Sequence, residues 1–188
     1  MSGDLKTVWT GGRRKLGADP LFGPWVKAIG TIRLPVATEE PFFYLARAIC
    51  YQQLAGAAAS TIHRETTLRG TGLSRAKLAA IRDLAQKVRS GEVEIHDLDE
   101  HTNEEVIRRL VLVKGIGEWT AQMYLIFRLF RPDVWPTGDL GVRAGYAKVH
   151  GLGEYPTQKE LGPLGEPYAP WRSAAAWYCY RVLDIEAP

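Results

Sequence analysis

The stretch that decides the fold class is Leu110-Val-Leu-Val-Lys-Gly-Ile-Gly-Glu-Trp-Thr-Ala121. A helix is predicted to enter it from the capping box Thr102-Asn-Glu-Glu105 and to end at about Val113. A second helix is predicted from Glu118 to Phe130, where the following proline stops it. The glycines between them permit the positive φ angles of a tight turn. The stretch therefore predicts two helices joined by a Gly-x-Gly turn, at about residues 103–130.

The turn between these helices also has a chemical interpretation. Gly115 and Gly117 leave backbone N–H groups uncovered beside the positive end of the second helix, where a phosphodiester can approach. Lys114 adds a positive charge whose contribution falls with salt. The alternative is an ordinary pair of antiparallel helices in which the glycines only turn the chain. The turn alone leaves both interpretations open.

The remaining chain shows helical patterns and no convincing alternation of a strand. The expected helices cover residues 41 to about 64 as one bent helix or two, 74–89, 139 to about 151, a short stretch after the capping box at 157–160, and 170–183. The first 18 residues are interpreted as a basic, flexible arm, and residues 19–188 as a helical domain of two lobes. The predicted fold class is all-α.

Composition excludes several classes of protein. Cys50 and Cys179 stand far apart, which excludes a disulfide framework, a zinc finger and a four-cysteine iron–sulfur cluster built by this chain. The four histidines have no paired spacing, which excludes a zinc protease and a zinc base deaminase. No apolar run reaches the ~18 residues of a membrane span, and the N-terminus lacks a secretory pattern, so we expect a cytoplasmic protein.

The charge distribution is compatible with a polyanionic partner. The formal net charge is +3, but the stretch from Arg108 to Lys148 holds seven basic and three acidic residues. Such a surplus also suits an ordinary solvated surface with mixed charges. Charge alone does not separate these interpretations.

Several ordered motifs together carry a family resemblance. The segments LVKGIGEWTAQMYLIF and DVWPTGDLGVR resemble the helix-hairpin-helix DNA glycosylase superfamily, in particular its 3-methyladenine DNA glycosylase II branch. The resemblance continues in LARAICYQQLAG, GLSRAKLAAIRDLA and PWRSAAAWYCYRVL, from about Asp19 to Leu183. It implies a compact, two-lobed helix-hairpin-helix glycosylase fold.

The resemblance makes Asp139 the catalytic carboxylate, which opposes the positive charge that grows on the deoxyribose as the base departs. The alternative role is a helix N-cap, and Asn would serve that role about as well as Asp. Trp119 stands where lyase-competent relatives carry a nucleophilic lysine, and an indole cannot form a Schiff base. The resemblance therefore implies a monofunctional enzyme in which Trp119 stacks on a cationic base. A Trp simply buried between helices is the alternative.

Further site residues also follow from the resemblance. The base pocket is expected to include Met123, Leu140 and Tyr180 beside Trp119, with core packing as the alternative for Met123. The side chain that fills the gap left by an extruded nucleotide is expected to be Gln53, or else Leu54. Arg172 is interpreted as architectural, with an internal carboxylate as its partner. The hairpin residues expected to contact DNA are Lys114, Gly115, Ile116, Gly117 and Thr120.

The predicted function is hydrolysis of the N-glycosidic bond of alkylated bases, such as 3-methyladenine, in double-stranded DNA. We expect a monomer in the bacterial nucleoid that uses no cofactor, except that the carbonyls of Gly115 to Gly117 could hold a monovalent cation. One alternative is a glycosylase for uracil, hypoxanthine or an oxidised base. Another is a non-catalytic helix-hairpin-helix module that binds damaged DNA, and a glycosylase with lyase activity is a third.

Overall fold

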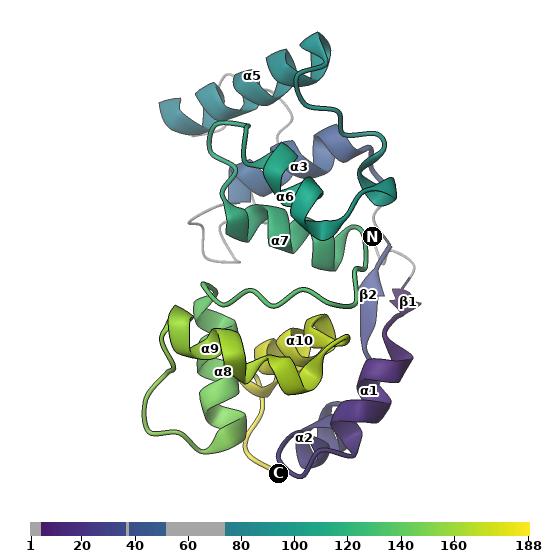
Figure 1. The fold of residues 1–188 in the computed structure, drawn as a ribbon, viewed down its shortest axis with the longest axis vertical. Helices are drawn as coiled ribbons and strands as arrows, with labels where there is room; N and C mark the ends of the chain where they lie inside the picture. Colours follow the sequence, from purple (N-terminus) through teal and green to yellow (C-terminus); the bar gives the residue numbers. More distant parts are fainter. Residues whose placement is uncertain (1–4, 37, 52–73) are drawn as a thin grey trace. The chain divides into compact units, whose positions relative to one another are not determined.

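The structure is a computed structural model that describes residues 5–36, 38–51 and 74–188 (Figure 1). These residues are mostly helical, with one two-stranded sheet, which confirms the all-α fold class. The chain divides into two compact units. Unit 1 comprises residues 1–36 and 125–188, and unit 2 comprises residues 37–124.

Unit 2 is built from helices whose ends follow local capping rules. It holds α3 (Pro41–Tyr51), α5 (Arg75–Ser90), the 3-10 turn η1 (Leu98–Glu100), α6 (Asn103–Leu110) and most of α7 (Glu118–Phe127). The Ser74 hydroxyl accepts the Lys77 N–H at the start of α5, and Gly91 ends that helix in the left-handed conformation. The predicted capping box of Thr102 and Glu105 opens α6.

The core of unit 2 comes from the apolar faces of these helices and the segment between α5 and α6. Its fully buried members are Leu45 and Ile49 of α3, Leu84 of α5, Val93, Ile95 and Leu98 of the connection, and Val106 and Leu110 of α6. Their spacing along each helix matches one face of the helical period. Burial of this face fixes α6 ahead of the hairpin turn.

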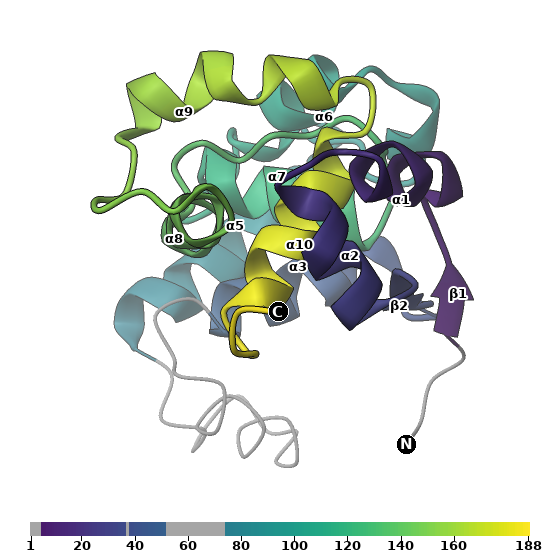
Figure 2. The same ribbon diagram turned by 90° about the horizontal axis from the view of Figure 1, so that it is seen from below.

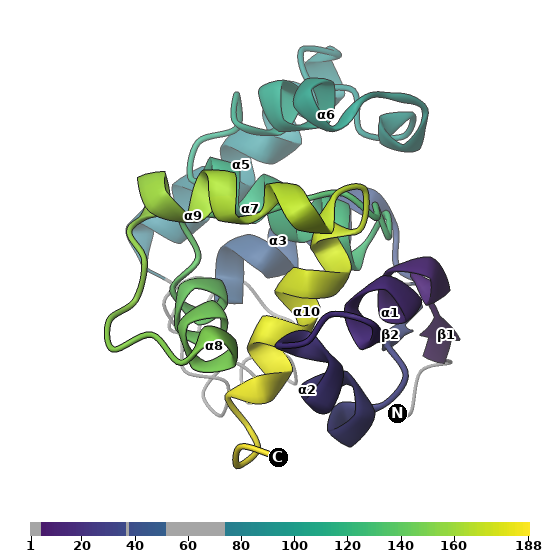
Figure 3. The same ribbon diagram turned by 60° about the horizontal axis from the view of Figure 1, so that its bottom comes forward.

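Unit 1 is arranged around its last helix. It holds β1 (Leu5–Thr7), α1 (Thr10–Gly17), α2 (Phe22–Ile29), β2 (Arg33–Pro35), α8 (Leu140–His150), α9 (Gln158–Leu164), the 3-10 turn η2 (Glu166–Tyr168) and α10 (Arg172–Val182). The strands pair antiparallel, with Lys6 opposite Leu34. Helix α10 packs against α8 on one side and against α1 and α2 on the other (Figures 2 and 3).

The contact between α8 and α10 is a backbone contact. A Cβ placed on Gly145 of α8 would lie 1.9 Å from the carbonyl oxygen of Cys179 in α10. The absence of a side chain at Gly145 therefore lets the backbones of α8 and α10 approach closely.

Four sequence predictions differ from the structure. Residues 10–17 form α1, and Trp9 and Leu16 are buried, so this segment packs within unit 1 where an arm was expected. Helix α2 was not among the expected helices. The strands β1 and β2 were not predicted, because three residues are too few to show alternation. Several helix ends shift by a few residues: α7 ends at Phe127 and α10 begins at Arg172.

Candidate active site

Asp139 is the N-cap of α8 in unit 1. Its Oδ1 accepts the Val142 N–H at 2.9 Å, and its backbone carbonyl accepts the Arg143 N–H. The residue is only 7% exposed, although a carboxylate rarely goes so far out of water without partners. The cap predicted from sequence is therefore real, and it also holds a negative charge in a largely buried position.

Tyr180 of α10 lies beside this carboxylate. Burial is the largest cause that raises the pKa of Tyr180. The negative charge of Asp139 and the hydrogen bond from Tyr180 to Asp139 raise this pKa further. The phenol therefore stays neutral and donates a hydrogen bond to the Asp139 carboxylate. Gly141 fits against the pair, since a Cβ there would lie 2.9 Å from Tyr180 Cε1 and 3.1 Å from Asp139 Oδ1. Sequence reasoning placed Tyr180 near the site but missed Gly141, which no local pattern distinguishes.

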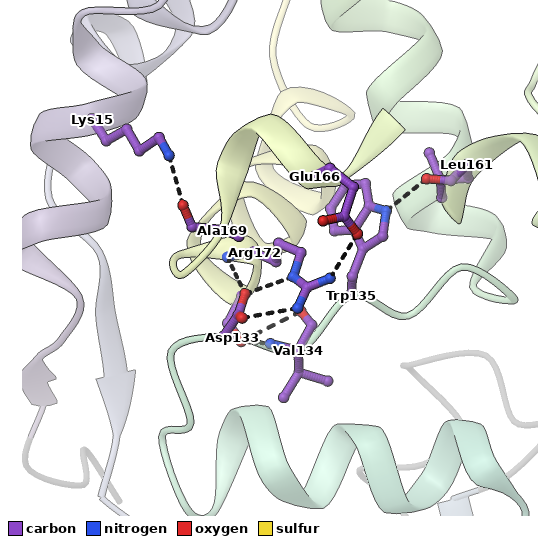
Figure 4. A network of polar contacts seen from close by, with 9 residues as sticks. Lys15, Asp133, Val134, Trp135, Leu161, Glu166, Ala169 and Arg172 are labelled. Carbon is purple, nitrogen blue, oxygen red and sulfur yellow. Dashed lines mark hydrogen bonds and ion pairs between the residues drawn. The ribbon is translucent and has the colours of Figure 1, made fainter. Parts of the chain in front are cut away.

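The loop that leads to Asp139 is fastened to the start of α10 (Figure 4). Arg172 donates from Nε to Asp133 Oδ1 at 2.6 Å and from its terminal nitrogen to Oδ2 at 2.8 Å, so the pairing is bidentate. The guanidinium holds the pKa of the Asp133 carboxyl below its usual range. The internal carboxylate expected for Arg172 is therefore Asp133.

Two further contacts hold the same loop. Val134 N–H donates to the Ser173 hydroxyl at 2.9 Å, and the Trp135 indole donates to the Leu161 carbonyl at 2.8 Å (Figure 4). Both contacts are buried. Together with the ion pair they fix the path of residues 132–136 just before Asp139.

The hairpin turn lies in unit 2, between α6 and α7. Asp83 of α5 accepts the Lys114 N–H at 2.7 Å, and this bond is the main cause that lowers the pKa of Asp83. The Ile116 N–H donates to the Val113 carbonyl at 3.0 Å, and the Ile116 side chain is buried. Two of the amides at the turn are thus already engaged inside the protein. Sequence reasoning missed Asp83, because nothing within its helix signals a partner 31 positions away.

The two glycines of the turn have different surroundings. Gly115 has φ +82°, and a Cβ on it would lie 2.8 Å from the Cβ of Ala80. Gly117 has no atom within 4 Å of its Cβ position, and its carbonyl accepts the Ala121 N–H at the start of α7. Gly115 is therefore required for packing on α5, whereas Gly117 leaves open space at the positive end of a helix.

The other predicted residues divide between exposed and buried positions. Trp119 is 46% exposed in unit 2, and Leu140 is 62% exposed next to Asp139 in unit 1. Met123 is half-buried, and Thr120 is buried, so the Thr120 side chain points away from solvent. The structure brings Asp139, Leu140 and Tyr180 together in unit 1 and the hairpin residues with Trp119 in unit 2. Gln53 and Leu54 lie outside the described residues.

Within residues 5–36, 38–51 and 74–188, no three His, Cys, Asp or Glu side chains are grouped as metal ligands would be. Cys179 is fully buried, and burial raises the pKa of its thiol. None of the described helices has the length and apolar character needed to cross a membrane.

The chain is similar to known proteins over nearly its whole length. No family model matches it. It is 34% identical over 193 residues to DNA-3-methyladenine glycosylase 1 of Schizosaccharomyces pombe, covering 90% of this chain and 85% of that protein. It is 27% identical to an alkylbase DNA glycosidase-like protein of the same yeast, covering 85% and 86% of the two chains.

Solved structures give the same result. The Schizosaccharomyces pombe 3-methyladenine DNA glycosylase, solved with abasic DNA, superposes with a TM-score of 0.86 at 32% identity, covering 95% of this chain and 99% of that one. A DNA-3-methyladenine glycosidase from Bacillus halodurans gives 0.79 at 29% identity, covering 95% and 91%. Because this chain is 34% identical, over 90% of its own length, to DNA-3-methyladenine glycosylase 1 of Schizosaccharomyces pombe, it belongs to the DNA-3-methyladenine glycosylase family.

Proposed function

We propose that this chain hydrolyses the N-glycosidic bond of alkylated bases, 3-methyladenine among them, in double-stranded DNA. The observation that carries the proposal is the Asp139 carboxylate, 7% exposed at the N-cap of α8 and hydrogen-bonded by Tyr180. The family membership of the chain supports the substrate class. For binding phosphates alone a neutral Asn cap would serve as well as Asp139, and it would not repel the anion.

The proposed reaction needs one well-placed negative charge. Methylation of a ring nitrogen makes the purine a cationic leaving group, so the bond from C1′ breaks as its electron pair moves to the base. Water then adds to C1′ and loses a proton. Asp139 stabilises the positive charge that develops on the sugar, an effect typically worth ~10²–10³ in rate. Little protonation of the base by the enzyme is required.

Trp119 and the hairpin supply binding in this proposal. The indole, 46% exposed, offers an electron-rich face for a cationic base. The open space at Gly117 and the start of α7 suit a backbone phosphate. Such contacts read the DNA backbone and give little sequence preference.

The decisive experiment compares release of free base from methylated duplex DNA by wild type, Asp139→Asn and Asp184→Asn. Asn keeps the N-cap and removes the charge. Asp184 is exposed in the same unit and serves as the matched control for loss of one carboxylate. We expect the first variant to bind DNA normally and lose ~10²–10³ in single-turnover rate, while the control matches wild type.

Two results would contradict the proposal. If Asp139→Asn releases base as fast as wild type, the carboxylate is only a cap. If wild type binds methylated DNA and releases no base, the substrate class is wrong, and duplexes with uracil, hypoxanthine or oxidised bases are the next substrates. Borohydride trapping on abasic DNA should give no covalent band, because Trp119 provides no amine.

The cellular location and the ion at the turn are part of the proposal. We expect the enzyme to act at chromosomal DNA, in the cytoplasm beside a nucleoid if the source is bacterial. A monovalent cation at the hairpin carbonyls would add positive charge near the bound phosphate. Replacement of potassium by a large organic cation at constant ionic strength should then weaken DNA binding.

A further inference from the structure

We infer that the hollow between α1 and α2 is a second binding site, specific for phosphate groups. The hollow has a volume of about 460 Å³, within the usual range of ligand pockets. The two helices lie side by side next to α10 (Figures 2 and 3). The side chains that give it chemical character are those of Thr10, Arg13, Arg14 and Lys27, and Gly17 and Gly23 expose backbone.

The charge of this hollow points to an anion. Three of its lining residues are basic and none is acidic. Within the described parts of the chain, none of the ion pairs involves Arg13, Arg14 or Lys27. Like charges gathered in one concave site repel one another, and a bound anion removes that repulsion. The hollow thus differs from an ordinary surface, where basic and acidic groups alternate.

The walls of the hollow are fixed by close packing. A Cβ on Gly12 of α1 would lie 2.7 Å from the Ala174 Cβ of α10, so α1 is seated tightly on that helix. Asp19 Oδ1 accepts the N–H groups of Leu21 and Phe22 and fixes the corner before α2. The Tyr178 hydroxyl of α10 donates to the Gly30 carbonyl at the end of α2 at 2.7 Å, so α2 is also fastened to α10.

These groups match the chemistry of phosphate. A guanidinium presents a planar fork of donors to two phosphate oxygens, Lys27 adds a point charge, and the Thr10 hydroxyl adds a donor. The phosphate could belong to a DNA strand or to a free diphosphate compound. Helix α10 separates this hollow from α8, which carries Asp139, so it is not part of the site described above.

The test measures binding of inorganic pyrophosphate by calorimetry and binding of an undamaged duplex across a salt series. The proteins are wild type, the double variant Arg14→Gln with Lys27→Gln, and the control Lys159→Gln. All three positions are exposed, and Lys159 lies on α9 away from the hollow. Equal thermal midpoints show that each variant is folded.

We expect the double variant to bind pyrophosphate at least ~10-fold more weakly, with the control within twofold of wild type. If the phosphate comes from DNA, the double variant also binds the duplex more weakly. Its plot of log affinity against log salt is then shallower by about 1.8, for two lost phosphate contacts. If the source is a free diphosphate compound, duplex binding is unchanged. A double variant that binds both probes as wild type does overturns the inference, and base release plays no part in this test.

Discussion

Substitution of Gly145 by Ala should separate the two helices that carry Asp139 and Tyr180. The added Cβ would stand 1.9 Å from the Cys179 carbonyl oxygen. A tolerable distance between carbon and oxygen is about 3.3 Å, so the backbones must part by roughly 1.4 Å. Neither atom can swing aside, because both belong to helices. A gap of that size removes a large part of the dispersion energy between the facing side chains of α8 and α10.

The Gly145→Ala substitution should lower the thermal stability of the protein. Overpacking of a core costs about 1–3 kcal/mol, and the contact of backbone with backbone places this variant at or above the upper end. For a chain of this size, 3 kcal/mol lowers Tm by about 6–12 °C. Base release should fall as well, even at a temperature where the variant is folded, because the Tyr180 hydrogen bond to Asp139 joins the two helices.

Differential scanning calorimetry of wild type, Gly145→Ala and Gly138→Ala measures this effect. Gly138 is the matched control, since a Cβ there would meet its nearest atom at 3.6 Å, an ordinary contact. Its Tm should stay within about 2 °C of wild type, as for most substitutions that meet no obstacle. If Gly145→Ala also melts within that range, the argument from close approach of α8 and α10 is wrong.

Three other predictions concern the binding groups and the loop before Asp139. Trp119→Ala should change stability by no more than about 0.5 kcal/mol, since the indole is 46% exposed, yet it should slow single-turnover base release; an unchanged rate would remove Trp119 from the site. Gly117→Ala should weaken duplex binding with Tm unchanged, whereas Gly115→Ala should lower Tm because of its φ of +82° and the contact with α5; equal Tm values would contradict this. Asp133→Asn should cost about 1 kcal/mol at pH 7. Because the pKa of Asp133 is lowered in the folded protein, its ion pair stabilises the fold above the unfolded pKa of about 3.9, and this stabilisation is lost as the pH falls through the folded pKa. The difference in free energy of unfolding between wild type and Asp133→Asn, measured with urea, should therefore be smaller at pH 3 than at pH 7.

The hairpin and the helices from α5 onward were predictable because their signals are local. Ser74, Thr102 and Thr157 cap helices through hydrogen bonds to residues three positions away, and those bonds are present. Gly91 and Gly151 end helices through their own φ angles. Such features depend only on residues that are close together in the sequence, so the sequence alone reveals them.

The sequence also determined the family and, through it, the identity of the candidate carboxylate. The sequence indicated both roles of Asp139. The N-cap depends only on the N–H of Val142, three positions later, and the catalytic role follows from the family motif around Asp139. The short strands β1 and β2 and the packing of α1 escaped prediction, since their stability comes from contacts with distant elements.

Only the tertiary structure decided which distant groups meet. Arg172 could have paired with any internal carboxylate, and packing chose Asp133, 39 positions earlier. Likewise, Asp83 accepts the Lys114 N–H from 31 positions away, and Tyr180 of α10 meets Asp139 at the start of α8, whose backbone lies close to that of α10 at Gly145. Local sequence sets how each segment folds, whereas the positions of side chains from separate segments depend on how those segments fill a common core.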